Sequence, residues 1–314
     1  MITTVTANAA IDKTYHVKRI ALHDVNRVAE VVAVPGGKGI NVAKVARTLG
    51  ARVTASGFLG GTNGQFIHQG IEQRGIASDF VRVEGNSRET IAILDEAGGT
   101  PTELLEPGPV VAEAAQHQLA EKIAALAKAS KVVVFSGSLP RGVPADFYAA
   151  LIQAAKREGA LTILDASGEP LARGIDAAPA ICKPNREEIG QLLGYRPDSR
   201  RELLRAAAKL IDKGVQAVIV SMDREGAIAV TAHAAWHIAP PPIEAVNSVG
   251  CGDAMVAGIA CHLDRGGSAL PDELPEALRL GTAAAASNAL HREAGFVRLQ
   301  EVTTFLPKVR ITRL

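Results

Sequence analysis

A run of polar and glycine residues, NSVGCGDAMVAGI at positions 247–259, leads directly into an apolar helical pattern. Gly250 and Gly252 permit a tight turn, so several backbone N–H groups can point the same way where the predicted helix begins. Unpaired N–H groups and the helix dipole together bind anions. Asp253 stands in that field, and a carboxylate beside a phosphate site can accept a hydroxyl proton during phosphoryl transfer. The alternative is a glycine turn in which Asp253 only caps the helix.

A second glycine turn occurs in PGGKGINVAKVARTLG at positions 35–50, where apolar residues on helical spacing follow the turn and Gly50 ends the helix. This turn does not match the Walker phosphate loop, because the second glycine and the Lys-Ser/Thr pair are missing at the required spacing. It could let the backbone approach a sugar, with Lys38 and Asn41 supplying hydrogen bonds. The alternative is a turn that starts a helix and carries a solvated lysine.

A third motif, KPNREE, follows a short apolar strand and contains Lys183, Asn185 and Glu188. The three-residue spacing of Asn185 and Glu188 is typical of a helix capping box. The same oxygen atoms could lie near a hydrated Mg²⁺, an ion that keeps several waters and uses few protein carboxylates. Both interpretations can hold together.

The order of the helices and strands around these motifs predicts an α/β protein. Amphipathic helices alternate with short apolar strands at 2–6, 52–59, 131–135, 161–164, 180–183 and 217–220. This alternation indicates a parallel sheet covered by helices on both faces, and such sheets bind ligands at the carboxyl ends of their strands. Polar groups follow five predicted strands, at 8–12, 136–138, Asp165, 183–185 and Ser221. We therefore expect one shared cleft.

Segments with strand-like alternation at 15–20, 25–34, 87–95 and 102–105 are out of step with this pattern, and a turn, GGTP, lies at 98–101. We expect them to form a small β lid, over about 13–34 and 86–106, on a single domain spanning 1–314. Arg27 and Arg88 lie in the lid. Charged residues on exposed strands commonly serve only to prevent the edge strand from pairing with another sheet. If the lid covers the cleft, the planar side chains of the two arginines suit a phosphate on the substrate. Ser138 could bind the same substrate, or could be a turn serine before Pro140.

Composition argues against several classes of function. A net charge of +1 over 314 residues gives no electrostatic reason to expect nucleic acid or an anionic membrane as partner. We expect neither a signal peptide, because the first residues are not basic and lack a long apolar run, nor a membrane span, which needs roughly 20 apolar residues. Three cysteines without CxxC spacing suggest free thiols in a reducing cytoplasm. Cys251 could be a reactive thiol, but a small residue whose backbone N–H matters is the favoured reading, because no His or Cys lies nearby in sequence.

Taken together, the motifs resemble those of the ribokinase-like sugar kinases, the phosphofructokinase B family. The resemblance is strongest to the hexose-phosphate branch that contains 1-phosphofructokinase and tagatose-6-phosphate kinase. It rests on segments that span nearly the whole chain in the family's order: TANAAIDKTY (6–15), PGGKGINVAKVARTLG (35–50), FLGGTNGQFI (58–67), TELLEPGP (102–109), FSGSLPRGVPADFY (135–148), DASGEPL (165–171), KPNREEI (183–189) and NSVGCGDAMVAGI (247–259).

The resemblance implies a ribokinase-like, Rossmann-type three-layer α/β sandwich, with a mostly parallel central sheet and a β lid through which two chains form a homodimer. It implies ATP and Mg²⁺, with a monovalent cation such as K⁺ as a further cofactor. Asp253 would be the catalytic base and Gly250, Cys251 and Gly252 the anion hole. The implied substrate contacts are Asp12, Arg27, Gly37, Lys38, Asn41, Arg88 and Ser138. The implied nucleotide contacts are Lys183, Asn185, Ser221, Asp223, Gly226, Ser248 and Asn288, with Asn185 and Glu188 near Mg²⁺.

The reaction that the resemblance predicts is ATP-dependent phosphorylation of a ketohexose phosphate, fructose 1-phosphate first and tagatose 6-phosphate second. Glu89 departs from the branch's usual pattern and is expected to add a negative charge near the substrate phosphate. Cys251 replaces a common alanine, which leaves the backbone N–H in place. Two alternatives stay open: a kinase of a free sugar or nucleoside, and a binding protein without catalysis. Arg27 and Arg88 argue against the first, and an intact Asp253 argues against the second.

Overall fold

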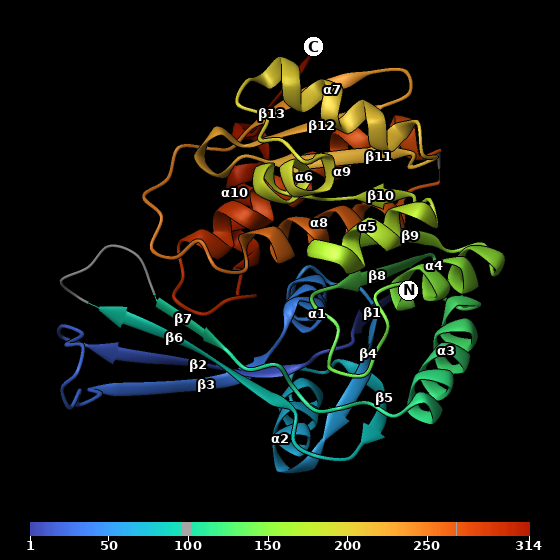
Figure 1. The fold of residues 1–314 in the computed structure, drawn as a ribbon. Helices are drawn as coiled ribbons and strands as arrows, with labels where there is room; N and C mark the ends of the chain where they lie inside the picture. Colours follow the sequence, from blue (N-terminus) through green and yellow to red (C-terminus); the bar gives the residue numbers. More distant parts are fainter. Residues whose placement is uncertain (96–101, 268) are drawn as a thin grey trace.

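The computed structural model describes residues 1–95, 102–267 and 269–314. A ten-stranded sheet with helices on both faces forms the body, and a four-stranded sheet extends from it (Figure 1). The turn predicted at 98–101 lies outside the described residues. The predicted α/β fold class is confirmed, and one domain over 1–314 stays a prediction.

The large sheet is parallel over most of its width and antiparallel at one edge. The strands from β11 to β5 pair in parallel, and β12, β13 and β14 continue the sheet with antiparallel pairing. The spatial order is β14 (Arg310–Arg313), β13 (Ala235–Ala239), β12 (Ala227–Thr231), β11 (Ala217–Ser221), β10 (Ile181–Cys182), β9 (Leu161–Asp165), β8 (Val132–Ser136), β1 (Ile2–Thr6), β4 (Val53–Gly60) and β5 (Ala77–Val83). The antiparallel edge was not predicted from the sequence.

Strands of the parallel region are apolar on both faces because each face supports its own core. In β8, Val132 and Val134 join one core, while Val133 and Phe135 join the other. Successive side chains of a strand point to opposite faces, so an unbroken apolar run serves both cores. This arrangement makes the body a three-layer sandwich.

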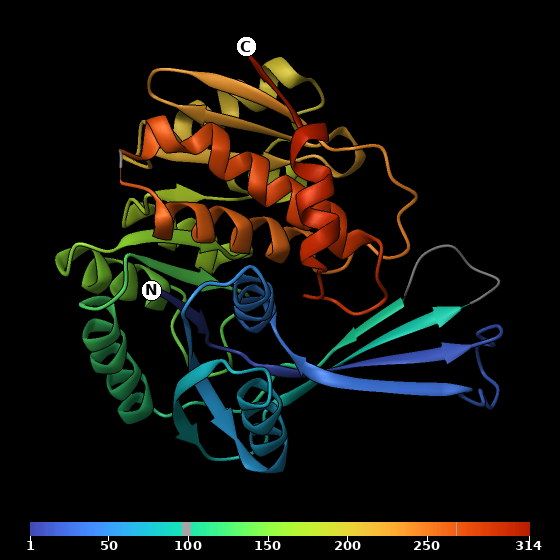
Figure 2. The ribbon, with the colours of Figure 1, turned by 180° about the vertical axis from the view of Figure 1, so that it is seen from behind.

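Two groups of helices cover the two faces. One face carries α1 (Lys38–Thr48), α2 (Gly61–Glu72), α8 (Cys251–Arg265), α9 (Leu270–Ala289) and α10 (Leu299–Phe305) (Figure 2). The other face carries α3 (Glu113–Ala127), α4 (Phe147–Arg157), α5 (Gly168–Asp176), α6 (Arg186–Leu193) and α7 (Arg200–Ile211) (Figure 1). Gly50 ends α1 as predicted, with φ of 87°, a conformation that glycine adopts without strain.

The β lid is the four-stranded sheet, in the order β3 (Glu30–Gly36), β2 (Ala10–Val17), β6 (Arg88–Asp95) and β7 (Thr102–Leu105). Its first two strands differ from the prediction, because β2 begins at Ala10 and β3 begins only at Glu30. Residues 18–29 form a loop at the outer end of the lid (Figure 1). Asn26 closes this loop by accepting from the Ala21 N–H and donating to the Ala21 carbonyl, both at 2.8 Å, so the apolar alternation there does not form a strand.

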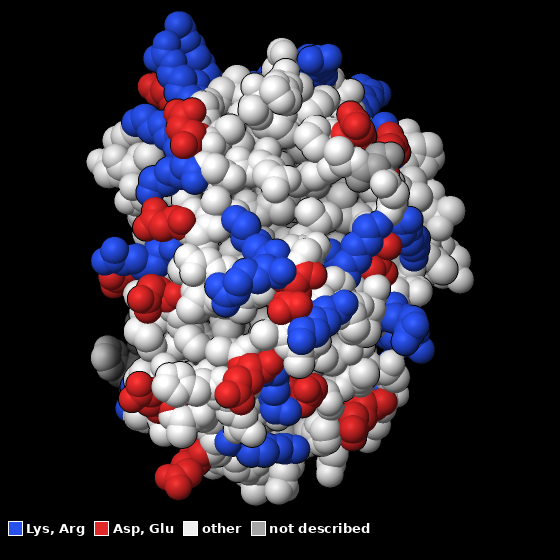
Figure 3. Space-filling model, turned by 90° about the vertical axis from the view of Figure 1, so that its right-hand side faces the viewer, with Lys and Arg blue, Asp and Glu red and all other residues white. Residues whose placement is uncertain are grey.

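Positive and negative side chains are interspersed on the molecular face shown in Figure 3. Within the described residues, no helix combines the length and the apolar character needed to cross a membrane.

Candidate active site

The predicted convergence of polar strand ends is confirmed. The strands β11, β10, β9, β8 and β1 are neighbours in the sheet and run parallel, so their carboxyl ends meet at one edge. Along that edge follow, in order, Ser221, Lys183, Asp165, Ser136 and Asn8.

Asp253 lies in the first turn of α8 and is 5% exposed. Gly250 precedes the helix at φ 81°, and a Cβ there would come within 2.9–3.1 Å of Gly295 and Ala294. Asn41 of α1 donates a hydrogen bond from Nδ2 to Asp253 Oδ2 at 2.9 Å. Burial raises the pKa of Asp253 to about 7, although Lys38, Lys183 and the Asn41 hydrogen bond oppose this rise. A carboxylate with that pKa suits a general base near neutral pH.

Two lysines share one carboxylate beside Asp253. Asp165, which is 1% exposed, accepts at Oδ1 from Lys38 Nζ at 3.4 Å and lies 3.3 Å from Lys183 Nζ. Burial alone would raise the pKa of Asp165, but the two ammonium groups outweigh it and hold the pKa below its ordinary value. Asp165 in turn raises the pKa of Lys38, so its ammonium stays charged. The group can present positive charge to a phosphate.

The glycine turn at 250–252 is held from behind by Asn288, which is fully buried. Asn288 donates to the Val249 carbonyl at 2.9 Å and accepts from the Gly295 N–H at 2.8 Å. Its side chain therefore supports the turn, and a direct contact with nucleotide stays a prediction. Ser248 is in the same turn, where its carbonyl accepts from the Cys251 N–H at 3.3 Å.

Cys251 has the properties of a structural thiol. Burial raises its pKa, and the Asn288 amide lies 3.5 Å from its sulfur atom. A raised pKa keeps the thiol protonated and a poor nucleophile. This observation argues against the interpretation of Cys251 as a reactive thiol.

Asn185 and Glu188 form the predicted capping box at the start of α6. Asn185 Oδ1 accepts from the Glu188 N–H at 2.7 Å, and Glu188 Oε2 accepts from the Asn185 N–H at 2.8 Å. Glu188 Oε1 takes no part in the box. No group of three or more His, Cys, Asp or Glu side chains able to hold a metal occurs in the described part of the chain. Such a donor set fits a hydrated Mg²⁺ held mainly by substrate phosphates, and not a cage of protein ligands.

Asp12 and the second glycine turn lie together at the inner end of the lid. Asp12 Oδ1 accepts a 2.6 Å hydrogen bond from Thr90, its neighbour across the β2–β6 pair. A Cβ at Gly36 would come within 2.0–2.3 Å of the Asp12 carboxylate, and Gly37 has φ of 98°. Both glycines are therefore required, one for space and the other for its backbone conformation.

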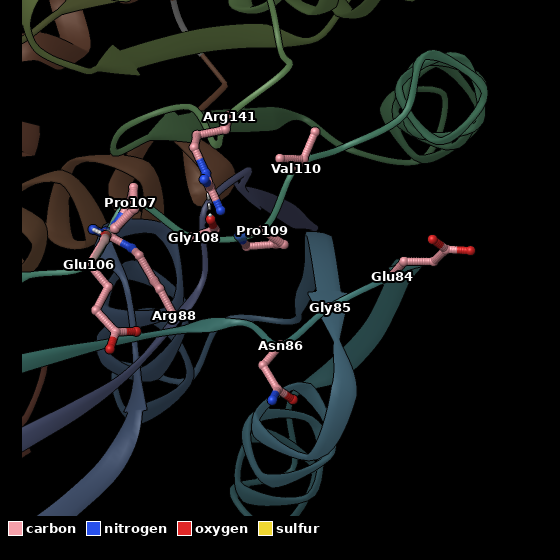
Figure 4. Close-up of a pocket in the computed structure, with 10 residues that line it drawn as sticks. All are labelled: Glu84, Gly85, Asn86, Arg88, Glu106, Pro107, Gly108, Pro109, Val110 and Arg141. Atoms are coloured by element: carbon pink, nitrogen blue, oxygen red, sulfur yellow. Dashed lines mark hydrogen bonds between the residues drawn. The ribbon is translucent and has the colours of Figure 1, made fainter.

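Arg88 is anchored in the same region by two backbone carbonyls. Its Nε donates to the Asn8 carbonyl at 3.2 Å and its Nη1 to the Glu106 carbonyl at 3.1 Å. Arg88 lines a pocket of about 560 Å³ together with Arg141, which donates to the Gly108 carbonyl at 3.1 Å (Figure 4). Ser138 is tied to this region through Asn8, whose Nδ2 donates to Ser138 Oγ at 3.3 Å and to the Pro107 carbonyl at 3.2 Å.

One expectation about the lid requires correction, and another cannot be met within a single chain. Glu89 pairs with Lys13 at 2.5 Å, and by strand alternation it points to the lid face opposite Arg88, so its charge is not presented to the Arg88 side. Arg27 lies in the loop at the outer end of the lid, whereas Arg88 pairs with Ala10 at the inner end. The seven residue-to-residue steps from Ala10 to Val17 in β2, at about 3.3 Å each, separate these ends by about 23 Å. The structure does not bring Arg27 to the site of its own chain.

The remaining predicted nucleotide residues lie beyond β10. Ser221 pairs with Asn185 in a parallel bridge, which connects the end of β11 to the capping box. Asp223 and Gly226 form the tight turn before β12, with φ of 50° and 87°. A Cβ at Gly226 would come within 2.0 Å of the Ile238 carbonyl oxygen, so this position requires glycine.

The sequence model of the pfkB carbohydrate kinases matches residues 5–300. The chain belongs to the pfkB family of carbohydrate kinases. It is therefore an ATP-dependent carbohydrate kinase.

Relatives of this kinase include a tagatose-6-phosphate kinase of Staphylococcus epidermidis, which is 37% identical over 314 residues and 99% of both chains. Phosphofructokinase-2 of Escherichia coli, in a structure with potassium, superposes with a TM-score of 0.90 at 28% identity over 98% of both chains. A "possible 1-phosphofructokinase" of Thermotoga maritima superposes at 0.88, with 27% identity over 100% of this chain and 99% of the other.

Two residues of the kinase have no role that could be predicted from the sequence. In the sequence Asp165 is only a polar strand end, and its contact with two lysines depends on the order of β8, β9 and β10 in space. Arg141 follows Pro140 in the SGSLPRG segment, and no local pattern marks it. Its neighbourhood with Arg88 arises because residues 106–110 cross between them.

Proposed function

We propose that this kinase transfers the γ-phosphoryl group of ATP to the free primary hydroxyl of a ketohexose phosphate, with tagatose 6-phosphate as the first candidate and fructose 1-phosphate as the second. This order reverses the expectation from the sequence. The reversal is supported by the tagatose-6-phosphate kinase that aligns with the whole chain. Related structures include both a 1-phosphofructokinase candidate and phosphofructokinase-2, so fructose phosphates stay in the comparison.

The main support for a substrate that already bears a phosphate is the pocket lined by both Arg88 and Arg141 (Figure 4). Arg88 uses Nε and Nη1 on backbone carbonyls, and Arg141 uses Nε, which leaves further N–H donors on each guanidinium. Guanidinium groups fixed in this way suit a phosphate oxygen acceptor. We assign the phosphate already on the sugar to this pocket, with Ser138 nearby and Asp12, Gly37, Lys38 and Asn41 on the sugar.

In the proposed reaction, a bond forms between the sugar oxygen and the γ-phosphorus while the bond to the β–γ bridging oxygen breaks, and ADP leaves. The hydroxyl proton passes to the Asp253 carboxylate. The N–H groups at 250–252 and the ammonium groups of Lys38 and Lys183 stabilise the charge on the transferring group. Mg²⁺ would supply charge neutralisation on the ATP phosphates, with Asn185 and Glu188 beside its waters. Ser221, Asp223, Gly226 and Ser248 are assigned to the nucleotide.

A homodimer through the β lid is part of the proposal. The lid carries exposed large apolar side chains, Val31, Val32, Leu104 and Leu105, which are 54%, 36%, 54% and 63% exposed. Val31 and Leu104 lie on the lid face opposite Asp12, and exposed apolar side chains on a projecting sheet are typical of an interface. Since Arg27 lies about 23 Å from Arg88 along the lid, its predicted role at the substrate phosphate requires two lids to interlock.

The test is a coupled assay of ADP release over a panel of tagatose 6-phosphate, fructose 1-phosphate, fructose 6-phosphate, free ketohexoses, ribose and a nucleoside. We expect the highest kcat/KM with tagatose 6-phosphate. Turnover with a free sugar or nucleoside and with no hexose phosphate would refute the proposal. The assay is repeated with and without K⁺ to test the predicted monovalent cation.

A further inference from the structure

Asp165 connects the two halves of the candidate active site through a single oxygen atom. Its carboxylate is 1% exposed at the carboxyl end of β9, and Oδ1 lies 3.4 Å from Lys38 Nζ and 3.3 Å from Lys183 Nζ. A buried carboxylate that holds two ammonium groups at one oxygen keeps two like charges close together. Without the carboxylate, those charges would repel and separate.

The two lysines belong to different half-sites. Lys38 is the first residue of α1, directly after the glycine turn whose Gly36 touches Asp12, and so it stands on the proposed sugar side. Lys183 stands on the proposed nucleotide side, because its Nζ lies 3.2 Å from the position of a Cβ on Gly252. Their burial also differs: the Lys38 side chain is 40% exposed and the Lys183 side chain 6%.

The other oxygen of Asp165 is unused. Among the described residues, Asp165 Oδ2 is buried without a hydrogen-bond partner, as is Ser136 Oγ on the neighbouring strand. A buried acceptor without a hydrogen-bond partner lowers the stability of the fold, so the Asp165 carboxylate is not explained by stability alone. Its contacts with Lys38 and Lys183 offer a functional explanation.

We propose that Asp165 is a positioning residue which fixes Lys38 and Lys183 together, and thereby sets the affinity for the sugar phosphate and for the nucleotide at once. This inference rests on the proposed function, since that function assigns one lysine to each substrate. In this role Asp165 acts on both substrates through the lysines. Its removal would release both lysines, whereas the removal of one lysine would leave the other in place.

Asp165 also acts on the charge of the proposed base. The groups that face Asp253 are Lys38 and Asn41 from α1, Lys183 after β10, and Asp165 at the end of β9. Asp165 raises the pKa of Asp253, and the two lysines lower it. Replacing Asp165 by a neutral residue removes a charge that raises the pKa of Asp253 and changes the positions of the two lysines that lower it. The pKa of Asp253 should therefore change, and the acidic limb of kcat should move.

The experiment compares Asp165→Asn with Lys38→Met and Lys183→Met. Isothermal titration calorimetry measures the dissociation constants of ADP and of the ketohexose phosphate that the wild-type enzyme turns over. We expect Asp165→Asn to weaken both ligands by about tenfold, as for the loss of a charged hydrogen bond in each half-site. Lys38→Met should weaken mainly the sugar phosphate, and Lys183→Met mainly ADP. In the Asp165→Asn background, Lys38→Met should weaken the sugar phosphate by much less than it does alone.

Thr162→Val is the matched control, because Thr162 is buried in the same strand and accepts from the Ala180 N–H at 3.1 Å without touching either lysine. It should lower the melting temperature and leave both dissociation constants and the pH profile unchanged. If Asp165→Asn does not fold, the double variant Asp165→Asn with Lys183→Met removes the stranded buried ammonium, and its sugar-phosphate affinity is compared with that of Lys183→Met alone.

The outcomes separate the two hypotheses. Wild-type turnover of a ketohexose phosphate tests the proposed function before any variant is made. The Asp165 inference is contradicted if Asp165→Asn weakens only one ligand, if its effect simply adds to that of Lys38→Met, or if the acidic limb of kcat does not move.

Discussion

Asn41 Nδ2 donates a 2.9 Å hydrogen bond to Asp253 Oδ2, although 212 residues separate them in the chain. The bond joins the first turns of α1 and α8, the two helices that follow the glycine turns. It orients the carboxylate and favours its charged form, against the burial that raises the pKa of Asp253 to about 7. The proposed base is therefore held by a residue of the helix that follows the other glycine turn.

The acidic limb of the pH–rate profile should therefore reflect the protonation of Asp253. The base must be deprotonated, so kcat should fall as pH drops through about 7. Asn41→Leu removes a hydrogen bond that lowers the pKa of Asp253, and its acidic limb should move to higher pH. Rates measured from pH 5 to 9 at saturating substrates check both statements. If the acidic limb of the Asn41→Leu profile does not move, Asn41 does not influence the pKa of the catalytic base.

The same pKa predicts a stability effect. The folded pKa of Asp253 lies above the ordinary value of 3.8, so the native state binds more protons than the unfolded state between about pH 4 and 7. Wild-type stability loses this contribution as pH rises through that window. Asp253→Asn has no such loss, so its melting temperature relative to wild type should rise from pH 4.5 to pH 8. A difference that is independent of pH would show that burial does not penalise the ionised carboxylate.

Arg88→Ala should raise the KM for the sugar phosphate by about tenfold or more, because charge-assisted hydrogen bonds to a phosphate are lost, and should leave the KM for ATP nearly unchanged. Arg141→Ala should act in the same direction. The control is Glu89→Gln: Glu89 is paired with Lys13 on the opposite lid face, so the change should stay within about twofold. Equal effects of Arg88→Ala on both substrates would mean that Arg88 only supports the lid.

Gly36→Ala should raise the KM for the sugar phosphate by about tenfold, because misplaced binding groups lose much of their effect. The added Cβ would come within 2.0–2.3 Å of the Asp12 carboxylate and displace it. Gly267→Ala is the matched control, since a Cβ there meets nothing within 4 Å. A normal KM with a well-folded Gly36→Ala protein would remove Asp12 from the substrate site.

The lid dimer can be tested without an activity assay. Val31→Asp combined with Leu104→Asp places two charges on the lid face opposite Asp12, and sedimentation velocity should then report monomers in place of dimers. Leu299→Asp, at a 52% exposed residue of α10, should leave the dimer intact. A wild-type protein that sediments as a monomer would contradict the lid interface.

Much of the body could be predicted from sequence because its elements are marked locally. The strand expected at 2–6 is β1, and the helix expected after the second glycine turn ends at Gly50. The antiparallel strands β12 and β13 escaped prediction because tight turns, such as the one at Gly226, connect them to their neighbours, so the alternation of helices and strands that marks the parallel strands is missing there. In the lid, the segment 25–34 is expected to be one strand, yet Val25 and Val28 lie exposed in a loop closed by Asn26.

In the candidate site, too, some features could be predicted from the sequence and others could not. Glycine turns, the capping box and the strand ends could be identified from short patterns, since each has a local physical cause. The contacts of Asp165 with two lysines and of Asn41 with Asp253 could not, because they depend on which strands and helices become neighbours. The side on which Glu89 lies required the register of β2 with β6.

The most direct test of the central claim is the turnover rate of Asp253→Asn with ATP and the preferred ketohexose phosphate. The variant keeps the size of the side chain and loses the base, so kcat should fall by about 10²-fold or more while ADP binding stays close to wild type. A kcat within a few-fold of wild type would contradict the assignment of Asp253 as the group that accepts the proton.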